Sequence, residues 1–309
     1  MRLILAYLYR FWKKDFHATL YGVVLVSVAI AIFFNYQFDF EDSIVDAQQK
    51  ELWGWPTYWL YFAVPYFYVI ALYHLILEQF HVSKRFWVNS LFAITLLSLK
   101  VWFFFHEGLM PETGPYQDKY LFYKIANALV NVSIYVFGLV MFYKFFEVGN
   151  KNWYGLAKKE NHWKVFALLL FIMVPLIVIA SLQPDFLESY PRLNVKVVKT
   201  NYWQWFGVYE PFYLGEFVAL EWFFRGFLVV GMVRLLGHRA VLPMTVLYCV
   251  FHFGKPMGEC IGSLFGGYIL GVIAYYSRSI WGGIIVHMGV ALFMDLAALA
   301  SHFIWKVGV

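Results

Sequence analysis

Nine long apolar runs are the feature that most constrains how this chain can fold. A helix that crosses a bilayer needs about 20 mostly apolar residues. Such runs lie roughly at 18–36, 57–77, 87–105, 121–146, 165–183, 208–232, 242–258, 259–277 and 282–305. Because backbone polar groups in lipid must be satisfied within the segment itself, helices are the form these runs favour. The sequence therefore predicts an all-α, polytopic membrane bundle.

The seventh and eighth runs are short. Gly254, Pro256, Gly258 and Gly262 fall at their junction, so two half-spanning or kinked helices also fit there.

The composition supports a membrane protein and excludes a soluble domain between the runs. Of 309 residues, 62% are hydrophobic and only 14% are charged, whereas soluble domains are about 45–50% apolar and about 25% charged. The net charge of +5 is typical of basic loops beside anionic lipid, so membrane lipids and not nucleic acid are the expected partners. We interpret Cys249 and Cys260 as small buried hydrophobic residues.

Loop charges alternate along the chain. Basic residues lie before the first run (Arg2, Arg10, Lys13, Lys14), after the second (Lys84, Arg85) and after the fourth (Lys151, Lys158, Lys159, Lys164). Acidic residues lie after the first run (Asp39, Glu41, Asp42, Asp46, Glu51) and after the third (Glu107, Glu112, Asp118). Since basic loops stay on the cytoplasmic side, the N-terminus is predicted to be cytoplasmic. The compact, loop-poor layout favours a bacterial inner-membrane protein.

Ionisable residues interrupt three of the last runs. Glu221 and Arg225 stand four residues apart, on one helix face, and each costs on the order of 2.5–3.5 kcal/mol in a bilayer. His252 and His287 lie within two later runs. A carboxylate and two imidazoles on three helices could activate a water, stabilise an oxyanion or bind a metal. Each also has a structural interpretation, as an ion pair or as an interhelical hydrogen bonder.

These residues resemble the motifs of the CPBP intramembrane proteases, which include CAAX prenyl endopeptidases and bacteriocin-immunity (Abi) proteins. The resemblance covers about residues 205–305. Glu221 and Arg225 match the second Glu and the Arg of the family's Glu-Glu-x-x-x-Arg box, Tyr248 and His252 match Phe-x-x-x-His, and His287 opens the third box. The resemblance implies eight core helices, so eight to nine are expected. It divides the chain into N-terminal helices (1–204) and a catalytic core (205–309) within one membrane unit.

Two polar positions of the family are apolar in this chain. Leu220 stands where the resemblance implies the general base, and Ala291 stands where it implies an Asn or Asp. Glu216 lies one turn before Leu220 and Asp295 one turn after Ala291. A catalytic site displaced by one helical turn, about 5.4 Å, is therefore a hypothesis to test.

The leading hypothesis is an intramembrane endopeptidase that hydrolyses a membrane-associated or secreted peptide. Glu221 (or Glu216) and His252 would activate water, His287 would hold the oxyanion, and Arg225, Tyr248 and Asp295 would support the site. No cofactor is expected, although zinc on Glu221, His252 and His287 stays open. The alternatives are a catalytically degenerate member that acts as a binding or scaffold protein, and a transporter that uses the same residues as a proton relay.

Overall fold

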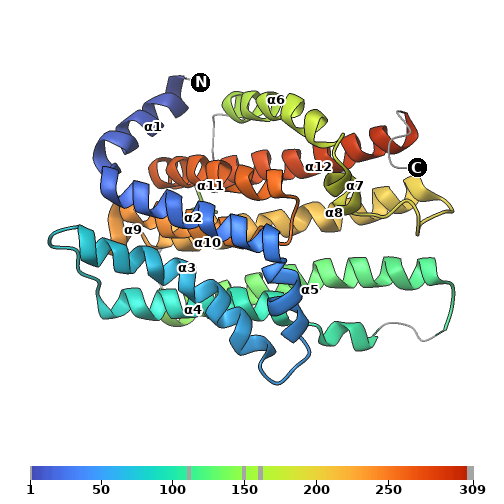
Figure 1. Cartoon of the computed structure of the whole chain (residues 1–309), viewed down its shortest axis with the longest axis horizontal. Coiled ribbons are helices and arrows are strands. Elements are labelled where there is room, and N and C mark those ends of the chain that lie inside the picture. The colour runs from blue at the N-terminus through green and yellow to red at the C-terminus, as the bar shows by residue number, and fades with distance from the viewer. Residues whose placement is uncertain (1, 110–112, 148–150, 159–162, 305–309) are drawn as a thin grey trace.

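The computed structural model of the chain describes residues 2–109, 113–147, 151–158 and 163–304, and within them it contains helices and no strands (Figure 1). The α-helices are α1 (Arg2–Asp15), α2 (Ala18–Phe38), α3 (Gly54–Ile76), α4 (Lys84–Trp102), α5 (Tyr116–Phe146), α6 (Trp163–Ala180), α7 (Pro184–Ser189), α8 (Tyr202–Glu221), α9 (Val233–Leu236), α10 (Val241–Val250), α11 (Met257–Ser277) and α12 (Trp281–Phe303). Shorter 3-10 or π-helical pieces are η1 (Glu41–Val45), η2 (Asp46–Gln48), η3 (Phe105–Leu109), η4 (Trp153–Gly155), η5 (Trp222–Gly231) and η6 (Gly237–Ala240).

The prediction of a helical membrane bundle is confirmed. Six described helices are long and apolar enough to cross a bilayer: α2, α3, α5, α6, α11 and α12. The run 242–258 is not one helix, because α10 ends at Val250 and a turn precedes α11. Ten residues rise only about 15 Å, half of a hydrocarbon core. The total of eight to nine spans stays a prediction, and residue 305, the predicted end of the last run, lies outside the described residues.

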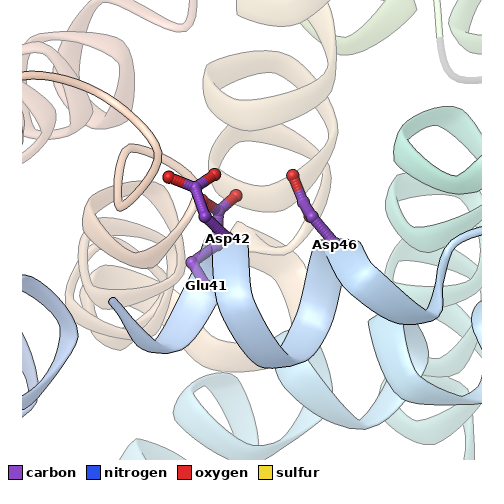
Figure 2. A group of neighbouring side chains, drawn as sticks. All are labelled: Glu41, Asp42 and Asp46. Carbon is purple, nitrogen blue, oxygen red and sulfur yellow. The ribbon is translucent and has the colours of Figure 1, made fainter. Parts of the chain in front are cut away.

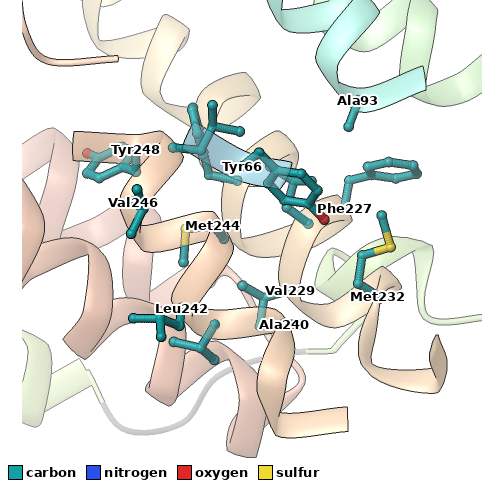
Figure 3. Packing of buried hydrophobic residues seen from close by; sticks show 14 of the residues in the cluster. Tyr66, Ala93, Phe227, Val229, Met232, Ala240, Leu242, Met244, Val246 and Tyr248 are labelled. Atoms are coloured by element: carbon teal, nitrogen blue, oxygen red, sulfur yellow. The ribbon is translucent and has the colours of Figure 1, made fainter. Parts of the chain in front are cut away.

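The helices that carry the motifs lie in the middle of the bundle (Figure 1). On one side, α8 packs on α5 and α10 packs on α3. On the other side, α8 packs on α12 and α10 packs on α11. Every residue of α10 is buried, and so are the first eight residues of η5. The apolar residues of these two elements form the core with α3 and α4, where Tyr66, Ala93, Phe227 and Met244 approach one another (Figure 3).

Helix α6 shows what the outside of the bundle faces. It packs on α12 at the edge of the bundle (Figure 1), and only Phe166 and Ile177 are buried. Most of its other residues are apolar and either exposed or half-buried, with Phe171 at 73% and Ile179 at 61%. A soluble protein rarely exposes such a contiguous apolar surface, so lipid is the solvent this helix fits.

The chain widens into a π-helix directly after Glu221. The segment η5 follows α8 without a break, and such π-helical turns frequently mark functional sites. The segment 151–158 lies against it, since Trp222 Nε1 donates to the carbonyl oxygen of Trp153 at 3.0 Å. A Cβ on Gly226 would come within 2.7 Å of the Tyr154 carbonyl oxygen, so this close approach requires glycine.

The cysteine interpretation is confirmed. Cys249 and Cys260 are free and fully buried, with their Sγ atoms 3.9 Å apart between α10 and α11.

Candidate active site

Glu221 lies at the C-terminal end of α8, and its side chain is completely buried. Its Oε1 accepts a hydrogen bond from Arg225 Nη1 at 2.7 Å, so the predicted pairing along one helix face is present. The guanidinium carbon of Arg225 also lies 4.1 Å from the centre of the Tyr248 ring, a cation–π contact. Both charges are therefore compensated inside the bundle, as buried ions must be.

His287 on α12 binds the same carboxylate oxygen. Its Nδ1 lies 2.9 Å from Glu221 Oε1, and because a carboxylate only accepts, Nδ1 carries the hydrogen. His287 Nε2 lies 3.3 Å from the Tyr248 hydroxyl, which donates to it. Phe217 covers one face of the imidazole, with ring centres 4.4 Å apart. The carboxylate thus fixes both the orientation and the tautomer of His287.

His252 lies in the turn after α10, next to Tyr248. Its Nδ1 lies 2.8 Å from the backbone carbonyl oxygen of Tyr248. Since a carbonyl only accepts, Nδ1 carries the hydrogen and Nε2 has the free lone pair. Among the described residues, none forms a hydrogen bond with His252 Nε2. The Tyr248 ring lies 4.4 Å from His252 and 6.1 Å from His287, between centres. Tyr248 therefore joins the two histidines of the predicted set.

A glycine on α12 makes room for the carboxylate. A Cβ added to Gly283 would lie 2.2 Å from Glu221 Oε2, a distance that no side chain tolerates. Glu221 Oε2 is itself buried without a hydrogen-bond partner. The second oxygen is thus held against the α12 backbone, and any residue larger than glycine at position 283 must displace it.

Leu220 and Ala291 are packed into apolar surroundings. Leu220 belongs to the main hydrophobic core and Ala291 to the cluster around Tyr213, with exposures of 9% and 4%. At these two family positions the side chains make apolar contacts and offer no polar group.

Glu216 and Asp295 bind elsewhere. Glu216 Oε2 accepts from Asn131 Nδ2 on α5 at 2.7 Å, and Asp295 Oδ1 accepts from the backbone N–H of Arg192 at 2.8 Å. Neither forms a hydrogen bond or ion pair with Glu221, His252 or His287. The structure therefore brings together Glu221, Arg225, Tyr248, His252 and His287, and leaves the two outlying carboxylates apart from them.

The residues that hold the His252 turn carry no signal in the sequence. Helices α2 and α3 reach it with three side chains: Asn35 Nδ2 donates to the Phe253 carbonyl at 3.2 Å, Tyr36 Oη to that of Lys255 at 2.6 Å, and Tyr61 Oη to that of Val250 at 3.2 Å. They lie about 190 to 220 positions away in sequence, and nothing in their local pattern marks them. The carbonyls of Phe253 and Lys255 belong to the turn between α10 and α11, so these hydrogen bonds tie that turn to α2 and α3.

The three residues on which zinc was left open, Glu221, His252 and His287, do not gather as a metal site. In the described part of the chain, one group of acidic or histidine side chains brings three ligand atoms within 4.8 Å of one another, namely Glu41, Asp42 and Asp46 (Figure 2). Burial, together with the charges of Asp46 and Asp42, raises the pKa of Glu41 to about 8. Oxygen ligands of this kind suit Mg²⁺ or Ca²⁺, but the cluster belongs to η1 and η2 and includes none of the predicted site residues.

The comparison with protein families locates the resemblance on this part of the fold. The chain is a helical membrane protein, and the family described as Type II CAAX prenyl endopeptidase Rce1-like matches residues 203–293. The matched segment runs from the first turn of α8 into α12 and includes Glu221, Arg225, Tyr248, His252 and His287. The predicted relation to CAAX-type proteases is confirmed for this segment. No curated protein and no solved structure matches the chain.

Proposed function

We propose that the chain is an intramembrane endopeptidase that hydrolyses a peptide bond with an activated water. One observation carries this proposal: a fully buried carboxylate, Glu221, orients His287 at 2.9 Å while a second imidazole, His252, keeps an unengaged Nε2 nearby. A carboxylate that fixes the tautomer of a histidine is a recurrent part of hydrolytic sites. The family match over residues 203–293 is to a protease family and supports the same reaction class.

The geometry favours His252 as the group that takes the proton from water. Its Nε2 has a free lone pair, and an imidazole is the usual general base near neutral pH. Glu221 has no exposed surface and Oε1 is already bound by Arg225 and His287. We therefore assign Glu221 a positioning role, as the residue that fixes His287, and we assign the Tyr248 hydroxyl to the oxyanion, with His287 as the residue that orients this hydroxyl.

Proton movement balances within these residues. Water gives its proton to His252 Nε2 and attacks the carbonyl carbon. The tetrahedral oxyanion accepts a hydrogen bond from the Tyr248 hydroxyl, whose present acceptor is His287 Nε2. His252 then returns the proton to the leaving amine. Because ligand atoms of Glu221, His252 and His287 do not lie within 4.8 Å of one another, we propose imidazole-activated water in place of zinc-bound water.

The charge pattern supports a location for this activity. We propose an inner-membrane protein with a cytoplasmic N-terminus, because α1 carries Lys13 and Lys14 in its last turn before the first span. We propose residues 205–309 as the catalytic core and residues 1–204 as its membrane scaffold. Lipids and a membrane-associated or secreted peptide are the expected partners.

Purified protein in nanodiscs, incubated with a library of internally quenched peptides, tests the reaction. Wild type is expected to cleave at least one sequence, and His252→Ala and Glu221→Gln to lose cleavage by 100-fold or more, the usual contribution of general-base catalysis. Glu216→Ala is expected to keep it within about threefold, a change of under 1 kcal/mol. Loss of cleavage in Glu216→Ala alone would favour the displaced site.

A second candidate function has its own observation. Leu220 and Ala291 replace polar residues of the family and are packed in the core. A catalytically degenerate member that binds a membrane protein or a secreted peptide fits this packing. If wild type cleaves no peptide of the library but retains the fold and binds peptides, the binding function replaces the enzymatic one.

A further inference from the structure

The proposed general base lies outside regular helix, in the His252 turn (residues 251–256 between α10 and α11). The backbone hydrogen bonds of this turn reach back only three residues. His252 N–H donates to the Cys249 carbonyl at 3.0 Å, and Lys255 N–H donates to the His252 carbonyl at 3.1 Å. Because connecting segments are more mobile than the helices they join, the position of the His252 imidazole depends on what holds the turn from outside.

Asn35 on α2 holds the turn with one amide that serves two backbone groups. Its Nδ2 donates to the carbonyl of Phe253, the residue after His252, at 3.2 Å, and its Oδ1 accepts from the Glu41 N–H at the start of η1 at 3.0 Å. Asn35 is only 5% exposed, within a helix that is apolar enough to span a membrane. A buried amide is costly unless its donor and its acceptor are both used. At Asn35 both are used, and both bonds are made at the edge of the proposed active site.

The segment η1 packs on the same turn. A Cβ added to Gly254 would lie 2.6 Å from Glu41 Oε2, so the Glu41 side chain lies directly against the backbone of the turn. The Asn35 amide therefore stands where α2, η1 and the turn meet. The hydroxyls of Tyr36 and Tyr61 also bind the carbonyls of this region, but each of these hydroxyls joins it to one helix, whereas Asn35 joins it to two elements.

The direction of His252 Nε2 follows from the backbone that Asn35 holds. Nδ1 is fixed by the Tyr248 carbonyl at 2.8 Å, which sets the tautomer of the ring. The Phe253 carbonyl is one peptide unit further along the chain, so a shift of this unit moves the imidazole. A general base must lie within hydrogen-bond reach of the water, and a misplacement of about 1 Å can reduce the rate by about 100-fold.

We propose that Asn35 is a positioning residue for the general base: by holding the Phe253 carbonyl against η1, it fixes the place and the direction of the His252 imidazole. The inference rests on the proposed function for its effect on cleavage, although the order of His252 can be measured without cleavage. It gives α2, which lies outside the family-matched segment 203–293, a part in the reaction beyond that of a scaffold.

The variant Asn35→Leu tests the proposal, because leucine keeps the branched shape of the side chain and removes both hydrogen bonds. Ser27→Ala is the matched control on the same helix. It removes the hydrogen bond between Ser27 Oγ and the Tyr68 hydroxyl at 2.6 Å, which joins α2 to α3 about 12 Å along the helix from Asn35. Asn35→Ser is a second variant in case the leucine variant does not fold. A serine hydroxyl can bind back to its own helix, and its side chain is too short to bridge the two backbone groups.

The kinetic test uses one cleaved, quenched peptide and folded protein in nanodiscs. Asn35→Leu and Asn35→Ser should lower kcat by about 10- to 100-fold and leave KM nearly unchanged, while Ser27→Ala cleaves like wild type. In the His252→Ala background, Asn35→Leu should lower the residual rate no further, since residues that act as a unit are not additive. A full additional loss in that background would show that Asn35 does not act through His252, and the proposal would be wrong.

A spectroscopic test works without any substrate. The imidazole ¹⁵N signals of His252, assigned by comparison with His252→Ala, report the order of the ring. Wild type and Ser27→Ala should show one sharp Nδ1–H tautomer, and the Asn35 variants should show broadened or split signals. Unchanged signals in the Asn35 variants would overturn the inference, whatever the cleavage. Changed signals in a protein whose wild type cleaves no peptide would overturn the proposed function and support Asn35 as the residue that positions His252.

Discussion

Two groups of charges lie in the interior of this bundle, and they are treated in opposite ways. Glu221, Arg225 and His287 are bound to one another at 2.7 Å and 2.9 Å. Four positive side chains, Lys100, Lys124, Arg192 and Lys255, make up what we call the cation cluster. In the described part of the chain no carboxylate oxygen lies within 4.0 Å of their nitrogen atoms, and Glu216, Glu259 and Asp295 act on them only at longer range. The charges of the first group are paired with each other, although Glu221 Oε2, Arg225 Nε and Arg225 Nη2 are buried without a hydrogen-bond partner, whereas the cations of the second group form no ion pair with the described residues.

The two groups contribute to the stability of the fold in different ways. A buried pair is held by its own hydrogen bonds, so removing one partner leaves the other uncompensated. An unpaired cation contributes no such bond, so removing it relieves repulsion. The two groups should therefore respond to loss of charge with opposite signs, and four experiments test that contrast.

Arg225→Met should produce the largest effect. It leaves Glu221 fully buried without its cation, which costs about 3–5 kcal/mol. Thermal unfolding in detergent micelles should show a large fall in Tm. The double variant Glu221→Gln, Arg225→Met should recover most of the stability but not the cleavage. Equal instability of the single and double variants would mean that the packing of Arg225, and not the ion pair, supports the fold.

Gly283→Ala should have the next largest effect. Its Cβ would meet Glu221 Oε2 at 2.2 Å, and relieving such overpacking costs about 1–3 kcal/mol. Because the carboxylate must move, kcat is expected to fall as well. Gly207→Ala on α8 is the matched control, since its Cβ meets no atom within 4 Å. Unchanged cleavage by Gly283→Ala would argue against the positioning role of Glu221.

The pH dependence of stability reports on the cation cluster. The pKa of Lys255 is lowered by burial to about 8 in the folded protein, against about 10.4 in an unfolded chain. Between these values the unfolded state binds more protons, so the contribution of Lys255 is fully present above the unfolded pKa and is lost as pH falls through 8. This contribution changes the free energy of unfolding by at most about 1.4 kcal/mol per pH unit. The difference in Tm between wild type and Lys255→Met, measured from pH 7 to pH 10, should rise with pH. A difference that does not change with pH would show that Lys255 is well solvated.

Lys124→Met should give the smallest change, and one of opposite sign to Arg225→Met. Without peptide, removing this unpaired cation is expected to stabilise the fold by about 1 kcal/mol or less, as replacing poorly compensated interior charge often does. A small rise in Tm for Lys124→Met would support the difference between the paired charges and the cation cluster. A fall of several degrees would show that Lys124 has a stabilising partner and that the two groups do not differ as described.

The sequence predicted the helical membrane class and the pairing of Glu221 with Arg225, because both depend on local spacing. It also selected His252 and His287, whose motif boxes lie in separate runs. It did not predict the π-helix after Glu221, since no single residue there breaks the helical pattern. It placed Glu216 and Asp295 as substitutes for the missing polar residues, whereas tertiary packing directs them to Asn131 and to the Arg192 backbone.

Long-range contacts account for the rest of what the sequence did not reveal. Asn35, Tyr36 and Tyr61 hold the His252 turn from helices near the other end of the chain. The cation cluster likewise consists of four side chains that are far apart in the sequence. In the sequence, the charges of the loops indicate only how the chain is oriented in the membrane. Only the fold brings Lys100, Lys124, Arg192 and Lys255 together.

The most direct test of the account is the ratio of kcat between wild type and His252→Ala on one cleaved, quenched peptide, with both proteins folded in nanodiscs. The account predicts a ratio of about 100 or more, the scale of a lost general base, with Tm changed by only a few degrees. Equal kcat values for two folded proteins would show that His252 does not activate the water, and the proposed mechanism would be wrong.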